Sequence, residues 1–145
     1  MTQAEYDYQR SVIRQNWMLA KAQIQSDTDN YRNMIEQRIN EEEDKHICKV
    51  NEMNEKRGKL HIEYLNLIRG GYSKESNAVI DNRVEINNLE EQFRQIKMAY
   101  GATIRDLRRD AHLHRRQNEA KSRDAKVEMC RQCAALAKEY HNSQN

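Results

Sequence analysis

Gly70 and Gly71 stand side by side near the midpoint of a 145-residue chain that contains no proline and only two further glycines. Glycine adopts backbone conformations that other residues avoid, so an adjacent pair inside an otherwise helical sequence is a strong turn signal. The pair divides the chain into two arms of nearly equal length. We therefore expect an all-α fold, namely a long antiparallel helical hairpin of the coiled-coil type that turns at Gly70 and Gly71.

The composition of both arms favours long helices over a globular core. Hydrophobic residues make up 37% of the chain and charged residues 33%, and the mean hydropathy is -1.14. Such a chain is too polar to bury a compact core. Disordered chains are rich in Pro, Gly and Ser, whereas this one consists mostly of helix-forming residues with regularly spaced large apolar side chains. A narrow apolar seam along long helices fits this composition.

The seam can be followed along both arms by its helical spacing. In the first arm it starts with alternating steps of three and four residues and passes through Asp27. After Tyr31 the better stripe runs through Ile35 to Ile39, as expected for a stutter. The second arm carries the more regular stripe. The expected seam residues are Ile13, Trp17, Ile24, Tyr31, Leu60 and Leu67 in the first arm and Ile86, Leu89, Phe93, Ile96, Tyr100 and Leu107 in the second.

Capping signals set the expected boundaries of the arms. Ser73 can cap a helix that has Glu75 in its first turn, where the helix dipole favours an acid. We expect a first arm over 1–69, a turn over 70–73, a second arm over 74–141 and a flexible tail over 142–145. The alternative is a single extended rod helix within a larger coiled-coil assembly, in which two glycines inside a helix would cost about 2 kcal/mol.

A hairpin with these boundaries predicts which positions of the two arms lie opposite each other. Position 28 would lie opposite position 113, so that a polar layer of one arm meets a polar layer of the other. Asp27 and Asp29 would then come near Arg115, Arg116 and His112. Among the aromatic residues, we expect Tyr8, Tyr72 and Tyr140 to make contacts outside the hairpin, since aromatic groups with one polar end are favoured at interfaces.

The basic segment, residues 105–126, is the most suggestive stretch for function. It holds eight Lys or Arg against four Asp or Glu. A basic helix of this kind can bind phosphates, acidic headgroups or an acidic protein surface such as that of tubulin, although it can equally be a solvated face. The expected partner-binding residues are Arg105, Arg108, Arg109, Arg115, Arg116, Lys121, Arg123 and Lys126.

No pattern of residues predicts a reaction, a cofactor or a metal. Cys130 and Cys133 form a CxxC with His112 and His114 upstream, but a continuous helix would separate His114 from Cys130 by roughly 24 Å, too far for shared metal ligation. Ser, His and acidic residues are scattered without a glycine-rich loop or a turn that would gather them. We expect no enzyme.

Composition and period resemble those of coiled-coil subunits of cytoskeletal and axonemal assemblies, without a diagnostic motif. The favoured function is a structural subunit that braces or lies along a larger protein assembly of the microtubule or axonemal type, with other helical proteins as partners. The alternative is a basic helical module that binds nucleic acid, which the net charge of +2 disfavours. With no expected transmembrane span or secretory signal, we expect a cytoplasmic location, with the cytoskeleton and the cilium as candidates.

Overall fold

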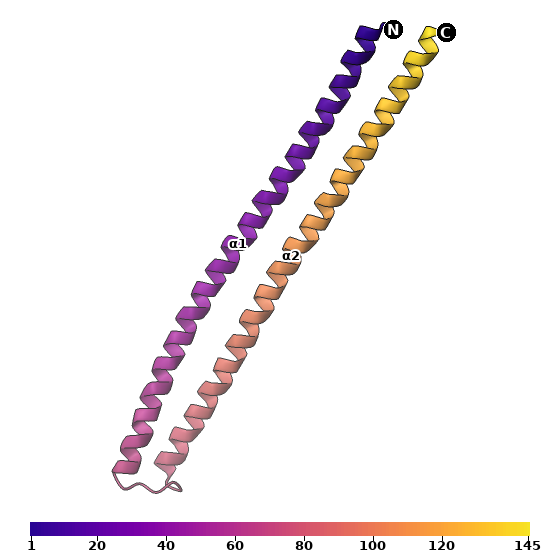
Figure 1. Cartoon of the computed structure of the whole chain (residues 1–145). Coiled ribbons are helices and arrows are strands. Elements are labelled where there is room, and N and C mark those ends of the chain that lie inside the picture. The colour runs from indigo at the N-terminus through magenta and orange to yellow at the C-terminus, as the bar shows by residue number, and fades with distance from the viewer. The chain divides into compact units, whose positions relative to one another are not determined.

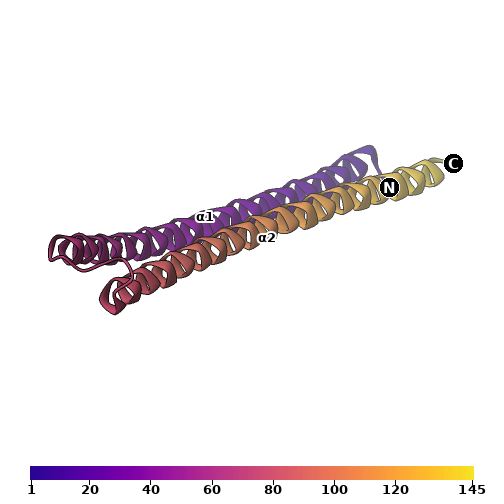
Figure 2. The same cartoon turned by 90° about the horizontal axis from the view of Figure 1, so that it is seen from below.

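The computed structural model describes the whole chain, Met1–Asn145, as two helices and a short connection. Helix α1 spans Gln3–Arg69 and helix α2 spans Asn77–Gln144. The chain divides into two compact units. The terminal unit comprises Met1–Ile35 and Arg109–Asn145, and the turn unit comprises Glu36–Arg108. Within each unit a stretch of α1 lies beside a stretch of α2 (Figure 1), and a second direction of view agrees (Figure 2).

The all-helical fold and the packing of two helices against each other confirm the coarse architecture expected from the sequence. The single continuous helix, which was the alternative, does not occur because α1 ends at Arg69. Gly71 adopts a φ of 87°, a left-handed conformation that closes the helix. Its amide donates to the Ile68 carbonyl at 3.1 Å, and the Tyr72 amide donates to the Leu67 carbonyl at 3.1 Å. These two bonds form a Schellman motif, which satisfies carbonyls that the helix end leaves without partners.

The second helix begins later than the sequence predicted. Ser76, not Ser73, caps it, because the Ser76 hydroxyl accepts from the Val79 amide at 3.4 Å and the Ser76 carbonyl accepts from the Ile80 amide at 3.0 Å. Ser73 instead offers its carbonyl to the Ser76 hydroxyl at 2.7 Å. The connection is therefore longer than residues 70–73. At its other end α2 continues through Gln144, so the segment 142–145 is helical over most of its length.

The first helix begins with a capping box that the sequence analysis did not identify. The Glu5 amide donates to the Thr2 hydroxyl at 3.1 Å, and the Glu5 carboxylate accepts from the Thr2 amide at 3.2 Å. Threonine followed three residues later by glutamate is the usual sequence signature of this motif. Two amides that would otherwise lack partners are thereby satisfied at the start of α1.

The later start of α2 shifts the pairing of the helices. Thr28 was expected opposite position 113, but in the terminal unit its hydroxyl accepts from Asn118 at 2.8 Å. In the turn unit His46 stacks on Tyr100 with ring centroids 4.0 Å apart. These two partners on α2 lie five positions further toward the C-terminus than expected, at 118 in place of 113 and at 100 in place of 95. The shift is not uniform, because His114 lies 3.2 Å from Asp27, within the stretch of α2 that was expected opposite it.

Each unit buries few apolar side chains, as a pair of helices must. In the turn unit the buried hydrophobic residues are Met53, Val79, Leu89, Ile104 and Leu107, and in the terminal unit they are Ile35 and Leu136. Along α1 the covered positions from Ile24 to Met53 are spaced by steps of four, three and four residues, a pattern that repeats every eleven residues. Asp29, which is partly covered, is the exception. This spacing passes through Thr28 and Ile35, whereas Asp27 and Met34 are exposed. Asp27 is therefore not a seam residue, contrary to expectation.

Glycine substitutions test the turn against the helix interiors. Gly71→Ala should destabilise the chain by about 1 kcal/mol, because a left-handed conformation strains any residue with a Cβ atom. Gly58→Ala should stabilise it by about 1 kcal/mol, since Gly58 lies inside α1 and a Cβ atom there meets nothing within 4 Å. Urea denaturation followed by far-UV circular dichroism measures both. A stabilising Gly71→Ala would contradict the assigned turn.

Candidate interaction surfaces

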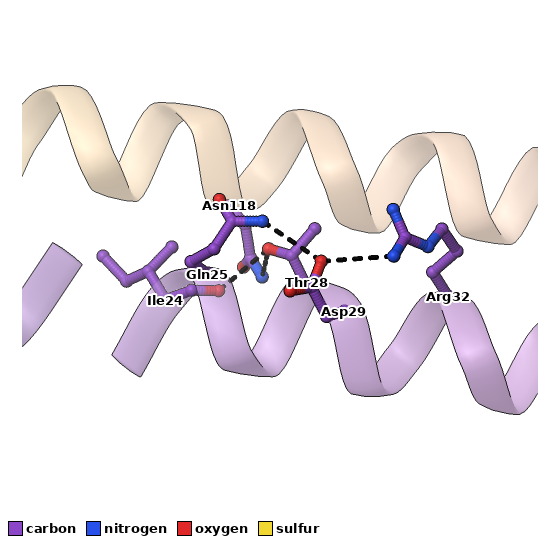
Figure 3. Close-up of polar contacts among 6 residues, drawn as sticks. All are labelled: Ile24, Gln25, Thr28, Asp29, Arg32 and Asn118. Carbon is purple, nitrogen blue, oxygen red and sulfur yellow. Dashed lines mark hydrogen bonds and ion pairs between the residues drawn. The ribbon is translucent and has the colours of Figure 1, made fainter. Parts of the chain in front are cut away.

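A polar layer crosses the helix pair in the terminal unit. Asn118 of α2 is 3% exposed and donates both amide hydrogens, to the Asp27 carboxylate at 2.9 Å and to the Thr28 hydroxyl at 2.8 Å. The Thr28 hydroxyl donates in turn to the Ile24 carbonyl at 2.9 Å. Figure 3 shows Asn118 reaching from α2 to Thr28, beside Ile24. Every hydrogen of this small network has an acceptor, which makes the buried amide compatible with a stable interface.

His114 and Tyr31 extend this layer along the helices. His114 Nε2 lies 3.2 Å from the Asp27 carboxylate, and its ring stacks on Tyr31 with centroids 3.9 Å apart. The expected partners Arg115 and Arg116 are not the ones that Asp27 meets. Arg115 approaches Glu119 of its own helix at 3.8 Å. Asp29 accepts from Gln25 at 3.1 Å and lies 3.4 Å from Arg32, also within its own helix (Figure 3).

The network alters the acidity of Asp27. The hydrogen bond from Asn118 is the main cause that lowers the pKa of Asp27 below 3.8, and the charges of His114 and Lys121 act in the same direction. A carboxylate whose pKa is lowered by folding stabilises the folded chain above its unfolded pKa, and this contribution is lost as the pH falls through the folded value.

Acid unfolding should therefore report on Asp27. As the pH falls below about 4, the wild-type chain should lose stability more steeply than Asp27→Asn, which has no carboxylate to protonate at this position. Asn118→Ala should flatten the same part of the profile, since it removes the main cause of the lowered pKa. Urea midpoints measured at successive pH values give the slopes. Equal slopes for wild type and Asp27→Asn would contradict this assignment.

The turn unit contains a second buried amide, in a different environment. Asn82 is 2% exposed and donates to the Leu60 carbonyl at 3.0 Å. Its own carbonyl oxygen is buried and has no hydrogen-bond partner. An unsatisfied buried acceptor costs free energy, so Asn82 fixes a contact between the helices at some expense of stability.

The structure places the expected seam residues at the contact between α1 and α2. Leu89 and Leu107 are buried, and the remaining ten are partly covered. Among the aromatic residues, Tyr8 and Tyr72 are exposed by 71% and 53%. Tyr140 was expected to make contacts outside the hairpin, but it contacts α1 instead. It stacks on Tyr6 at 4.5 Å between ring centroids and donates its hydroxyl to Gln3, because the shifted pairing of the helices brings it against the start of α1.

The expected partner-binding residues are all exposed on α2. They are Arg105, Arg108, Arg109, Arg115, Arg116, Lys121, Arg123 and Lys126. Two of them, Arg123 and Lys126, line a groove of about 400 Å³ in the terminal unit together with Trp17 and Lys21 of α1. Sequence reasoning placed Trp17 in the seam and the cations in the basic segment, but it did not bring them together. Their shared groove depends on the pairing of the helices.

The cysteines and histidines whose spacing superficially suggested a metal site make separate contacts and do not form a cluster. Cys130 is exposed, and the Cys133 sulfur lies 3.9 Å from the Met129 sulfur. His114 is engaged with Asp27 and Tyr31, as described above. No group of three or more His, Cys, Asp or Glu side chains is arranged to hold a metal ion.

The fold is a pair of helices, and the grooves described here lie on its surface and are open to solvent. No family model, no curated protein and no solved structure matches the chain. Neither helix contains a stretch that is long and apolar enough to cross a membrane. The surfaces of the two units are therefore the candidate interaction sites.

Proposed function

We propose that the chain is a non-enzymatic structural subunit that braces or lies along a larger protein assembly of the cytoskeletal type in the cytoplasm. The observation that carries this proposal is the exposure of all eight cations of the basic segment on α2, which leaves them available to an acidic protein surface. Each unit is one pair of helices, so most side chains outside the seam face outward.

Large apolar residues on the outer faces support the same proposal. Met18 and Leu19 in the terminal unit are each 63% exposed, and Ile62 and Met98 in the turn unit are 60% and 68% exposed. Single exposed apolar residues are common on proteins. Here they accompany helices whose inner faces are already paired, so they offer contacts to additional helices of an assembly.

We further propose that the helix pair is an antiparallel coiled coil with little supercoiling. A strict seven-residue repeat imposes a left-handed supercoil, and an eleven-residue repeat imposes a right-handed one. The covered positions of α1 mix both spacings, so the seam follows nearly the natural period of an α-helix. Such a subunit can lie along a partner without having to match a steep superhelical pitch.

The experiment reverses cations of the basic segment that lie outside the Trp17 groove. Arg105→Glu, Arg108→Glu and Arg116→Glu in one chain should abolish incorporation into the cytoskeletal fraction of the native cell, while helicity is retained because helix propensity barely changes. The control set, Arg14→Glu, Lys74→Glu and Lys138→Glu, makes the same change of net charge at exposed positions outside the basic segment. It should leave incorporation intact.

The two sets of variants separate docking from general charge effects. Normal incorporation of the basic-segment variant would overturn the proposal. A salt titration of binding to purified microtubules and to duplex nucleic acid tests the alternative function. Nucleic-acid binding whose logarithm falls steeply and linearly with the logarithm of salt concentration, without microtubule binding, would replace the structural subunit by a nucleic-acid module.

A further inference from the structure

The groove in the terminal unit combines an aromatic ring with an excess of positive charge. It is lined by Trp17 and Lys21 of α1 and by Glu119, Ser122, Arg123 and Lys126 of α2. Three cations face one carboxylate. The Lys21 ammonium lies 5.3 Å from the centroid of the Trp17 ring, a cation–π contact that holds one of these charges at the groove.

Trp17 also has an unused hydrogen-bond donor. Its indole Nε1 is shielded from solvent and has no acceptor in the chain. A buried indole N–H usually has a partner, and leaving it without one costs free energy. A carboxylate that entered the groove would lie among the three cations, beside the Trp17 side chain.

The same chain carries a segment with the complementary charge. The acidic segment, Glu41–Asp44, is a run of four consecutive acids on α1 in the turn unit. Glu42 is occupied by an ion pair with Lys45 at 3.7 Å. Glu41, Glu43 and Asp44 are exposed, and Ile47, one turn beyond Glu43, is 48% exposed. Successive residues of a helix differ by about 100° in direction, so Glu43, Asp44 and Ile47 share one side of α1, with Glu41 pointing away from Glu43. That side of the segment thus offers two carboxylates and an apolar side chain to three cations and an indole.

From this match we infer that a second copy of the chain docks its acidic segment into the Trp17 groove. The carboxylates pair with Lys21, Arg123 and Lys126, and Ile47 supplies apolar contact at the indole. Charge pairs of this kind set the register and the partner more than they add affinity, whereas a tryptophan and an arginine are the residue types that most often dominate an interface. The inference concerns self-association and does not rest on the proposed function.

The contact has to form between two molecules. Trp17 and the acidic segment belong to the same continuous helix α1, which cannot fold back on itself while it remains helical. The donor of the carboxylates is therefore a different copy from the one that supplies the groove. Since groove and acidic segment are different surfaces, each copy carries one of each, and both can be engaged by neighbouring copies.

Reciprocal charge reversal tests the inference on the full chain. The groove variant carries Lys21→Glu, Arg123→Glu and Lys126→Glu, and the segment variant carries Glu41→Lys, Glu43→Lys and Asp44→Lys. Either variant alone places like charges against each other, so its Kd for self-association should rise by at least about tenfold. A mixture of the two variants restores opposite charges at both contacts and should associate about as strongly as the wild type.

Two measurements follow the association. Sedimentation velocity gives the assembled fraction, and the fluorescence of Trp17 reports the groove directly because it is the only tryptophan in the chain. Emission of the wild type should change with protein concentration and revert as salt is raised, since salt screens exposed ion pairs. The control set defined above, which makes the same charge change as the groove variant, should associate like the wild type.

Every outcome decides the inference. Recovery of association in the mixture, together with the return of the Trp17 signal, supports it. A wild-type chain that remains monomeric with constant emission overturns it, and so does self-association that neither variant weakens. If the groove variant loses incorporation into the native assembly while the wild type never self-associates, a different acidic protein occupies the groove. That last result would overturn the inference and leave the proposed function standing.

Discussion

Leu89→Ala should destabilise the turn unit by about 3 kcal/mol. Leu89 is 8% exposed and lies between two surface grooves, one of about 430 Å³ shared with Leu60 and Lys59 and another shared with Met53 and Phe93. Truncation removes apolar contacts on both sides at once, and a leucine-to-alanine change at a buried position costs about 2–5 kcal/mol. We expect a value away from the upper limit because water can enter from either groove.

Val84 provides the matched control for Leu89. It lies on the same helix in the same unit but is 50% exposed, so Val84→Ala should change the free energy of unfolding by no more than about 0.5 kcal/mol. Urea denaturation followed by circular dichroism measures both variants. A Leu89→Ala chain as stable as the Val84→Ala chain would show that the helices are not held together at Leu89.

The helical fold was largely predictable because its signals are local. The absence of proline, the regular apolar spacing and the paired glycines each act within a few residues, and together they identify the helices and the position of the turn. The pairing of the helices was not predictable to the same accuracy. It depends on the choice between Ser73 and Ser76 as the cap of α2, two serines separated by three residues that have similar intrinsic preference for that position.

The buried amides could have been found from the sequence by spacing alone. Asn82 lies three residues after Val79 and four before Ile86, so it occupies the seam position between them. Asn118 likewise follows His114 by four residues. Both were missed because the stripe of the second arm was traced through apolar and aromatic residues without these amides. A different cause explains why Thr28, and not Asp27, occupies the seam. Adjacent residues on a helix differ by about 100° in direction, and the stutter decides which of the two faces the partner helix.

The Trp17 groove could not be predicted because its residues come from both helices. Trp17 and Lys21 share one face of α1, which the sequence can indicate, and Arg123 and Lys126 share one face of α2. Whether these faces meet is decided by the pairing of the helices, and a shift of a few residues would separate them. Surface charges carry no comparable signal that fixes their neighbours.

The two buried asparagines make the sharpest contrast in the chain, because the same substitution should have opposite effects at the two positions. Asn118→Leu should destabilise the terminal unit by about 2 kcal/mol, since it removes the donor to Asp27 and Thr28 and places an apolar side chain against a carboxylate. Asn82→Leu should be neutral or stabilise the turn unit by about 1 kcal/mol. Its carbonyl oxygen has no partner, and the Leu60 carbonyl that it bonds also belongs to a helix.

Separate probes can assign each change to its unit. Trp17 fluorescence follows unfolding of the terminal unit, and the amide hydrogen exchange of Met53 and Leu89 follows that of the turn unit. A buried amide also restricts how helices pair, so Asn82→Leu should gain stability while admitting other pairings, visible as new cross-links between the helices. If Asn82→Leu destabilised its unit as much as Asn118→Leu destabilises the other, the missing partner of the Asn82 carbonyl would have no energetic consequence, and satisfied and unsatisfied amides would contribute alike.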